Sequence, residues 1–283
     1  MSYLTFYKLK EPPFANVPDL RFFYSSPHYA ESFDKLLDSI KEGKQLITVL
    51  GRCGLGKTVI SRKVLSLFES KEDTYEVLLM VCIHSDMAAG WLLQRIAMQL
   101  KVEPEKENKG SYFEAVAKKF DKLGNEGKQI VILVDEANMI DNVEVYEEIR
   151  GLMDFLSDNR QKFSVVLFGL PVLEDKLAKS EPIYQRIETR IVLKPFPVTK
   201  ETTDYIEHRL KLAGASEKIF SDAAYHSIHL NSRGNLRLIN IICDNALTEG
   251  YLLKQKIIDE PDVNRIIIEM GYNTRLKILF LDA

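Results

Sequence analysis

The sequence predicts an α/β protein in which a parallel five-stranded sheet, flanked by helices, is followed by a small all-helical domain. Five apolar runs of strand length show no polar alternation, and amphipathic helical stretches separate them. This pattern is typical of a parallel sheet that is buried on both faces. After Pro195 and Pro197 only helical patterns follow. The length of 283 residues suits two domains, at about 150 residues per domain.

The opening 26 residues are rich in aromatic residues and proline, and we expect an extended segment packed on the domain surface. Phe6, Tyr7 and Phe14 either pack on the chain's own domain or form a partner surface. A helix follows, because Ser26 can cap it, Pro27 suits its first position and Gly43 suits its end.

The remaining elements follow from apolar periodicity. The predicted strands are residues 46–50, 77–83, 130–134, 165–168 and 191–193. The predicted helices are residues 59–68, 91–100 and 112–123, and then 201–212, 221–227, 235–253 and 260–270 in the all-helical part. We therefore divide the chain into residues 1–44 (aromatic segment and first helix), 45–195 (α/β domain), 196–272 (helical domain) and 273–283. That last stretch is an apolar tail, which we expect to pack on the body or on a neighbour.

Composition excludes several classes of protein. Apolar residues make up 46% and charged residues 28%, which rules out collagen-like, low-complexity and largely disordered chains. A net charge of -3 argues against a wholly electrostatic nucleic-acid binder, although it permits a local basic face. No apolar run approaches the ~20 residues that a membrane-spanning helix needs.

Cysteine usage indicates a reducing compartment. Cys53, Cys82 and Cys243 are odd in number and far apart, so a disulfide framework or zinc ribbon is not expected. Because the chain also opens without a signal-peptide pattern, we expect it in the cytoplasm, with peripheral docking at the inner membrane left open.

A phosphate-binding loop is predicted at residues 51–58, which read GRCGLGKT and match G-x-x-x-x-G-K-[ST] between a strand and a helix. Glycines let backbone N–H groups turn toward phosphate oxygens, and the following helix adds its positive end. Lys57 can reach the β and γ phosphates, and the Thr58 hydroxyl can ligate Mg²⁺. The residues expected to contact the nucleotide here are Gly51, Cys53, Gly54, Leu55, Gly56, Lys57, Thr58 and Val59. Cys53 is either a passive small residue or a redox-sensitive one.

Two carboxylates end the third predicted strand, in the sequence QIVILVDEAN. Asp135 is expected to hold the Mg²⁺ shell with Thr58, and Glu136 to polarise the attacking water. Together with the phosphate loop, this pair predicts ATP and Mg²⁺ as cofactors and hydrolysis as the reaction. Asn138 either orients water or the γ phosphate, or caps the next helix. The five histidines show no metal spacing, so no other metal is expected.

These motifs resemble the AAA+ ATPases, and more closely the ExeA group, also called general secretion pathway protein A. The resemblance covers about residues 3–270. Besides the two ATPase motifs, it rests on residues 6–14 (FYKLKEPPF), 17–32, 150–177 and 232–247 (SRGNLRLINIICDNAL). The opening segment is its most specific part, because the ATPase motifs are shared far more widely.

The resemblance implies roles for arginines outside these motifs. Arg186 is the candidate arginine finger acting on a neighbour's ATP, with Arg190 as second choice. The alternative for Arg186 is a surface ion pair with an acidic residue such as Glu181. Arg237 matches the second-sensor position in the helical lid, where it would contact the γ phosphate; the alternative is a helix-surface charge. Leu170 departs from the family, which has a polar residue between Gly and Pro there. Either the first sensor lies elsewhere or hydrolysis is slow.

The sequence therefore favours an ATP-hydrolysing AAA+ motor or switch for a bacterial envelope machine: type II secretion, a type IV pilus or polysaccharide export. The expected partners are other copies of the chain, in a nucleotide-dependent ring or partial ring, and an inner-membrane protein. The alternative is a DNA-binding ATPase like the transposition helpers, for which Lys118, Lys119 and residues 160–162 supply only sparse basic residues. A non-hydrolysing scaffold is the third possibility, which Asp135 and Glu136 disfavour.

Overall fold

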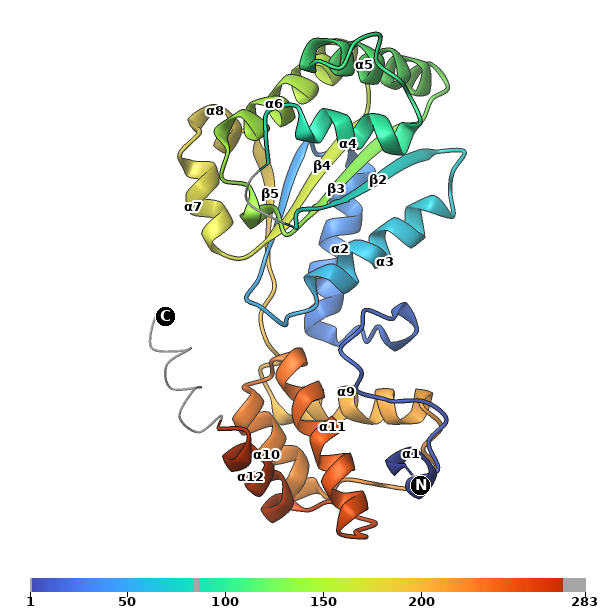
Figure 1. Ribbon diagram of the computed structural model, residues 1–283, viewed down its shortest axis with the longest axis vertical. Helices are drawn as coiled ribbons and strands as arrows, with labels where there is room; N and C mark the ends of the chain where they lie inside the picture. Colours follow the sequence, from blue (N-terminus) through green and yellow to red (C-terminus); the bar gives the residue numbers. More distant parts are fainter. Residues whose placement is uncertain (1, 84–86, 272–283) are drawn as a thin grey trace. The chain divides into compact units, whose positions relative to one another are not determined.

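A computed structural model describes residues 2–83 and 87–271 (Figure 1). The chain forms two compact units. One, the α/β unit, comprises Tyr29–Cys53 and Lys57–Leu193. The other, the helical unit, comprises Met1–His28, Gly54–Gly56 and Lys194–Ala283. The stretch 1–44 is thus shared between both units, and the apolar tail at 273–283 lies outside the described residues.

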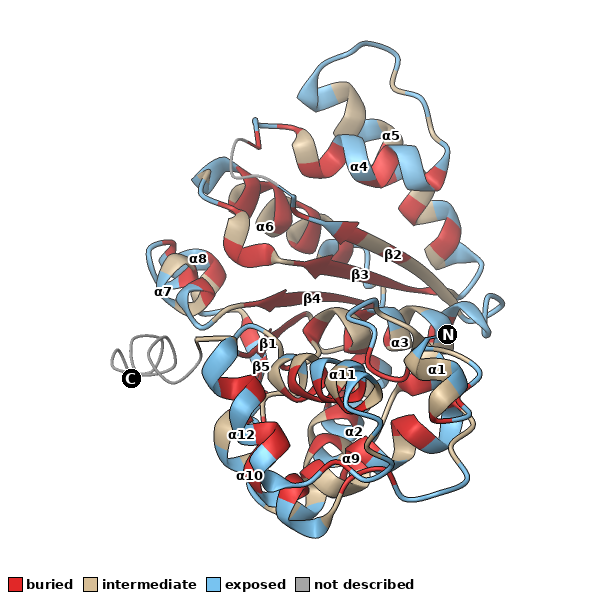
Figure 2. Ribbon diagram, turned by 60° about the horizontal axis from the view of Figure 1, so that its bottom comes forward, coloured by how far each residue is buried: buried red, intermediate tan, exposed pale blue. Residues whose placement is uncertain are grey.

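The α/β unit is built on the predicted parallel sheet of five strands, in the order β2-β3-β4-β1-β5. The strands are β1 (Leu46–Leu50), β2 (Tyr75–Val81), β3 (Gln129–Asp135), β4 (Phe163–Gly169) and β5 (Ile187–Val192). Every residue of β1, β3 and β4 is buried, as Figure 2 shows for β3 and β4. This burial on both faces explains why their sequences are apolar without alternation.

The strand predictions differ from the structure mainly at the sheet edges. Residues 46–50 are confirmed as β1, whereas the second strand begins and ends two residues earlier than expected. The fifth strand begins at Ile187, four residues before the predicted start. Its residues are alternately buried and exposed, because β5 is an edge strand. A search for continuous apolar runs therefore misses its first part.

Helices cover both faces of this sheet (Figure 1). They are α2 (Pro27–Glu42), α3 (Lys57–Glu69), α4 (Trp91–Leu100), α5 (Lys109–Asn125), α6 (Val143–Asp158), α7 (Val172–Ala178) and α8 (Glu181–Tyr184), with a 3-10 turn η2 (Ala137–Met139). The side chains of Ile130, Ile132 and Val134 join the core formed with α4, α5 and α6. The intervening Val131 and Leu133 are equally buried and face away from that core.

The outer edge of β2 is bonded to a side chain. The Gln99 amide on α4 donates from Nε2 to the Leu79 carbonyl at 2.8 Å, and its Oε1 accepts from the Leu79 N–H at 3.1 Å. Both polar groups of Leu79 are therefore satisfied without a neighbouring strand.

The helical unit contains α9 (Thr199–Leu212), α10 (Asp222–Ser232), α11 (Leu236–Leu252) and α12 (Glu260–Glu269). All four predicted helices are thus present, with ends displaced by up to five residues. Asn235 caps α11, because its side chain accepts from the backbone N–H of Arg237 and of Leu238. Asp259 begins α12 with a reciprocal capping box to Asp262.

The opening segment is less extended than predicted. It contains a helical turn, α1 (Tyr3–Phe6), and a 3-10 turn, η1 (Leu20–Phe22), which the Asp19 side chain caps. Tyr7 and Phe14 are buried within the helical unit. The hypothesis that these two rings form a partner surface is therefore wrong, because they pack on the chain itself.

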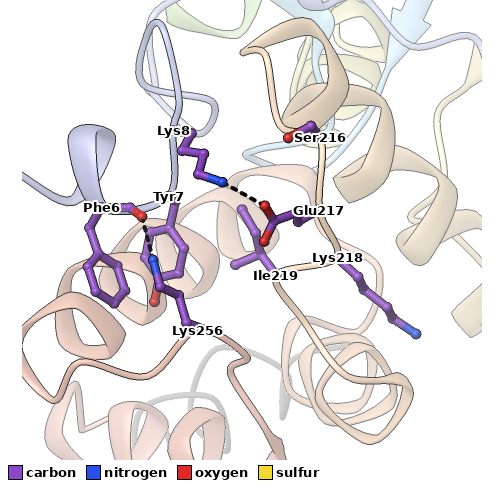
Figure 3. A pocket seen from close by; sticks show the side chains of 8 residues that line it. All are labelled: Phe6, Tyr7, Lys8, Ser216, Glu217, Lys218, Ile219 and Lys256. Carbon is purple, nitrogen blue, oxygen red and sulfur yellow. Dashed lines mark hydrogen bonds and ion pairs between the residues drawn. The ribbon is translucent and has the colours of Figure 1, made fainter.

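Polar contacts hold the start of this segment to the helical unit (Figure 3). Lys8 pairs with Glu217 at 2.7 Å, and the Lys256 ammonium donates to the Phe6 carbonyl at 3.1 Å. The same ammonium lies 4.0 Å from the centre of the Phe6 ring. Three exposed contacts of this kind fix the chain's position more than they add to its stability.

A buried arginine holds the middle of the segment. Arg209 on α9 is only 7% exposed, and it donates to the carbonyls of Pro13 and Ala15 and to the Tyr205 hydroxyl. Its guanidinium also lies 4.8 Å from the centre of the Phe22 ring. Carbonyl oxygens and ring faces therefore compensate the burial of this charge.

Candidate functional site

The predicted phosphate loop follows β1 directly and ends where α3 begins at Lys57. Gly54 and Gly56 have φ values of +82° and +79°, a left-handed conformation that favours glycine. The Lys57 side chain is buried, and its Nζ donates to the carbonyls of Gly51 at 2.8 Å and Arg52 at 3.3 Å. The Lys57 ammonium thus donates to carbonyls of its own loop, and a phosphate could replace these carbonyls as the hydrogen-bond acceptor.

Asp135 lies beside the first turns of α3. The carboxylate is buried, and its Oδ2 is 3.5 Å from Oγ of Ser61, which is one turn beyond Thr58. Its Oδ1 accepts from the backbone N–H of Glu136 at 3.0 Å. Sequence reasoning missed Ser61, although its spacing from Lys57 and Thr58 along one helix was visible.

Glu136 has an unusual backbone conformation. Its φ of +53° and ψ of +37° are left-handed, which costs a non-glycine residue roughly 1–2 kcal/mol. The strand ends there, and the half-buried carboxylate receives no hydrogen bond from the residues that the structure describes. Burial, with the charges of Asp135 and Glu136 as smaller causes, raises the pKa of the nearby Cys82 thiol to about 12.

Asn138 does not cap the following helix, which corrects one of its two predicted roles. Asn142 caps α6 instead, by accepting from the Glu144 N–H. The Asn138 side-chain oxygen accepts from the backbone N–H of Leu170 at 2.8 Å, and the side chain is buried. Asn138 therefore joins the loop after β3 to the end of β4.

Arg237 lies beside part of the phosphate loop. Both Arg237 and Gly54–Gly56 belong to the helical unit. The Arg237 backbone N–H donates to the Gly54 carbonyl at 3.2 Å. A Cβ on Gly54 would lie 2.7 Å from the Arg237 Cβ and 2.5 Å from Oδ1 of Asn235. Only glycine at position 54 allows this close contact without a displacement of Asn235 and Arg237.

An open pocket of about 440 Å³ lies nearby in the helical unit. Its lining residues are His28, Lys194, Pro195, Phe196, Pro197, His229 and Arg233. The Phe196 N–H donates to the Gly234 carbonyl at 3.0 Å, which places the pocket wall one residue before the cap of α11. The Nδ1 of His229 is bonded to the Thr202 hydroxyl at 2.8 Å.

Both candidate arginine fingers have partners. Arg186 pairs with Asp154 of α6 and not with Glu181, which accepts from Gln185 instead. Arg190 on β5 pairs with Glu174 at 3.1 Å and lies 4.9 Å from the centre of the Tyr184 ring. Sequence reasoning did not find Asp154, because it is 32 residues before Arg186.

The remaining predicted residues lie on or beside the loop. Leu55 is buried, Cys53 is exposed and Val59 is half-buried in the first turn of α3. Among the described residues, no cluster of three or more His, Cys, Asp or Glu side chains could hold a metal ion. No helix within that part of the chain has the length and apolarity to cross a membrane.

Comparisons with known proteins agree with this fold. Residues 40–177 match the family described as AAA domain. The fold and this match make residues 40–177 similar to AAA domains. One relative among curated proteins is general secretion pathway protein A of Aeromonas hydrophila, which is 28% identical over 275 residues. The predicted resemblance to the ExeA group is thereby confirmed.

The match covers 95% of this chain and 48% of that relative, so the chain spans about half the relative's length. Among solved structures, Cdc6p from Pyrobaculum aerophilum has a TM-score of 0.69 at 19% identity, covering 89% of this chain and 71% of that one. Drosophila ORC bound to DNA has a TM-score of 0.65 at 18% identity, covering 95% and 66%. At these identities both show the fold alone.

Proposed function

We propose that the chain binds ATP with Mg²⁺ and hydrolyses it at the carboxyl edge of β1 and β3. The observation that carries this proposal is the approach of Asp135 to Ser61 on the helix that opens with Lys57 and Thr58. Phosphate oxygens would replace the carbonyls that now accept from Lys57. Glu136 would take the proton of the attacking water, because its carboxylate is half-exposed and accepts no hydrogen bond from the described residues.

The oxygen atoms at this site are suitable ligands for a magnesium ion. A buried carboxylate and hydroxyls from one helix turn are hard oxygen ligands, which Mg²⁺ prefers. Thr58 and Asp135 would hold the ion, with Ser61 orienting the Asp135 carboxylate through its hydroxyl. When bound, Mg²⁺ would neutralise charge on the β and γ phosphates.

We assign a binding surface for a flat aromatic ring, such as a nucleotide base, to the pocket that Phe196 lines within the helical unit. Apolar Pro195, Phe196 and Pro197 offer a surface for a flat ring, and His28 and His229 offer polar groups at its edge. The contact between Arg237 and Gly54 supports a phosphate position for the Arg237 side chain. Each of these groups belongs to the helical unit, as do Gly54–Gly56.

The relative's name supports a proposal for the biological role. We propose a nucleotide-dependent motor or switch that assembles with copies of itself and serves a bacterial envelope machine through an inner-membrane protein. Arg186 would act on the ATP of a neighbouring copy. The similarity to general secretion pathway protein A over most of this chain supports this role.

Paired variants test the chemistry. Lys57→Ala should abolish ATP binding, since the lysine is the buried cation of the loop. Glu136→Gln should bind ATP and not hydrolyse it, because an amide cannot act as base. The matched control is Glu144→Gln, an exposed carboxylate in the first turn of α6. Hydrolysis by Glu136→Gln at the wild-type rate would refute the assignment.

A second candidate function is DNA binding, which one observation favours. Lys128, Arg160 and Lys162, from two neighbouring loops, line a single pocket of about 450 Å³. None of the three has an ion-pair partner among the described residues. Phosphate contacts weaken steeply with salt, so sedimentation with long duplex DNA and ATP across a salt series tests this function. ATP-dependent co-sedimentation near physiological salt, about 150 mM, would favour it over the envelope role.

A further inference from the structure

Four charged side chains form a continuous row that runs from α6 to Arg186, the residue before β5. Glu147, Arg150 and Asp154 recur at three- and four-residue spacing, so they share one face of α6. Arg150 donates from Nε to Glu147 at 2.7 Å and from Nη1 to Oδ2 of Asp154 at 2.8 Å. The other Asp154 oxygen, Oδ1, pairs with Nη2 of Arg186. Asp154 is therefore shared by two guanidinium groups, one on each oxygen.

This arrangement constrains Arg186 in a specific way. A guanidinium is planar and has five N–H donors in a fixed fork, so holding Nη2 limits the plane of the group. No hydrogen bond or ion pair from its Nε or Nη1 is found among the described residues. The Arg186 side chain is 33% exposed. One end of the fork is thus held, and the other donors remain accessible.

Charge balance supports a role for Arg150 as well. A carboxylate beside a finger arginine would weaken its attraction for phosphate. Arg150 supplies a second positive charge to the same carboxylate and shares it with Glu147, so the Asp154 charge stays partly offset when Arg186 faces a phosphate. The hydrogen bond to Glu147 is the main cause that raises the pKa of Arg150 above its ordinary value, which keeps Arg150 charged.

We propose that Asp154 is the positioning residue of the trans-acting Arg186, and that Arg150 holds Asp154 in place for this task. The inference rests on the proposed function, in which Arg186 of one copy reaches the ATP of the next. A single exposed ion pair would contribute little to stability. A carboxylate that two guanidinium groups share, within a row of four charges, instead fixes the orientation of the Arg186 guanidinium. Asp154 touches no nucleotide and acts only through Arg186.

Mixed subunits separate this role from a structural one. Lys57→Ala subunits do not bind ATP and still offer Arg186, whereas Arg186→Ala subunits bind ATP and lack the finger. In the mixture, ATPase activity therefore requires that a Lys57→Ala subunit supplies Arg186 to the ATP bound by an Arg186→Ala subunit. Asp154→Asn, which keeps size and removes charge, is then added to one kind of subunit at a time.

In the Lys57→Ala subunits, Asp154→Asn should lower kcat of the mixture about three- to fivefold, with KM for ATP unchanged. In the Arg186→Ala subunits the same change should have no effect, because no finger remains there to be positioned. Arg150→Gln in the Lys57→Ala subunits should act in the same direction. Asp38→Asn, which breaks the exposed pair with Lys41, is the matched control.

The outcomes separate the two proposals. If the parent mixture has no activity, Arg186 is not a trans finger, and both the finger and its positioning are refuted. If the parent mixture is active and Asp154→Asn acts equally in both subunits, or in neither, only the positioning role is refuted. A loss confined to the finger-donating subunit supports it, since a folding defect would appear in both.

Discussion

The side-chain oxygen of Asn138 accepts a hydrogen bond from the backbone N–H of Leu170 at 2.8 Å. The bond joins the segment after Glu136 to the end of β4, where the ExeA group has a polar side chain and this chain has leucine. Leucine cannot hydrogen-bond to phosphate or water. Asn138 is therefore the polar side chain that reaches this position, although it uses its oxygen for the backbone.

Replacing Asn138 with alanine should leave the Leu170 N–H without its acceptor. We expect a loss of about 1 kcal/mol in the free energy of unfolding and a larger relative loss in kcat for ATP hydrolysis. Urea unfolding and steady-state ATPase assays measure the two effects. Asn159→Ala, which removes an exposed side-chain bond to Phe155, is the control. An unchanged kcat would show that Asn138 serves the fold alone.

Leu170→Gln should accelerate hydrolysis if the missing polar group limits the rate. The Leu170 side chain is only half-buried, so an amide can be placed there at little cost in stability. Single-turnover ATPase rates compare the variant with the wild type, and Leu170→Met controls for the change in shape. A glutamine variant no faster than wild type would contradict this expectation.

Gly54→Ala should abolish ATP binding, and Gly43→Ala should not. Both glycines have left-handed backbones, with φ of +82° and +80°, so each alanine adds roughly 1–2 kcal/mol of strain. At Gly43 the nearest atom to a new Cβ lies 3.6 Å away, whereas at Gly54 two atoms lie closer than 3 Å. Fluorescent-nucleotide titration, with melting curves to confirm folding, measures the difference. Equal ATP affinity in both variants would argue against the close approach of Arg237.

Stability should fall as the pH drops below about 6.5, the ordinary pKa of histidine. Burial, aided by the charges of Arg209 and Lys211, lowers the pKa of His208, and its buried Nε2 has no partner among the described residues. The unfolded chain thus takes up a proton that the folded chain resists, so the free energy of unfolding rises with pH through this range. Urea unfolding at about pH 5.5 and about pH 7.5 measures the slope. His208→Gln should flatten it, and an unchanged slope would exclude His208 as its source.

The sequence predicted those parts of the fold whose signals are local. The phosphate loop, β1 and the first helix needed only a motif, an apolar run and a proline. β5 was predicted too short because one of its faces is exposed, and so its sequence alternates. The contacts of Arg237 with Gly54 and of Arg186 with Asp154 join distant parts of the chain. No spacing rule predicts such pairs, because packing brings them together.

The amide of Gln99 has a consequence for how copies of the chain can associate. Subunits with an open sheet edge can join by adding strand to strand, a route that leads as readily to aggregates as to defined assemblies. Gln99 occupies both backbone groups of Leu79 in the middle of the β2 edge. An incoming strand would first have to displace that side chain. Association through this edge is thereby disfavoured, so copies of the chain that associate here would have to meet through side-chain surfaces, as the proposed nucleotide-dependent assembly requires.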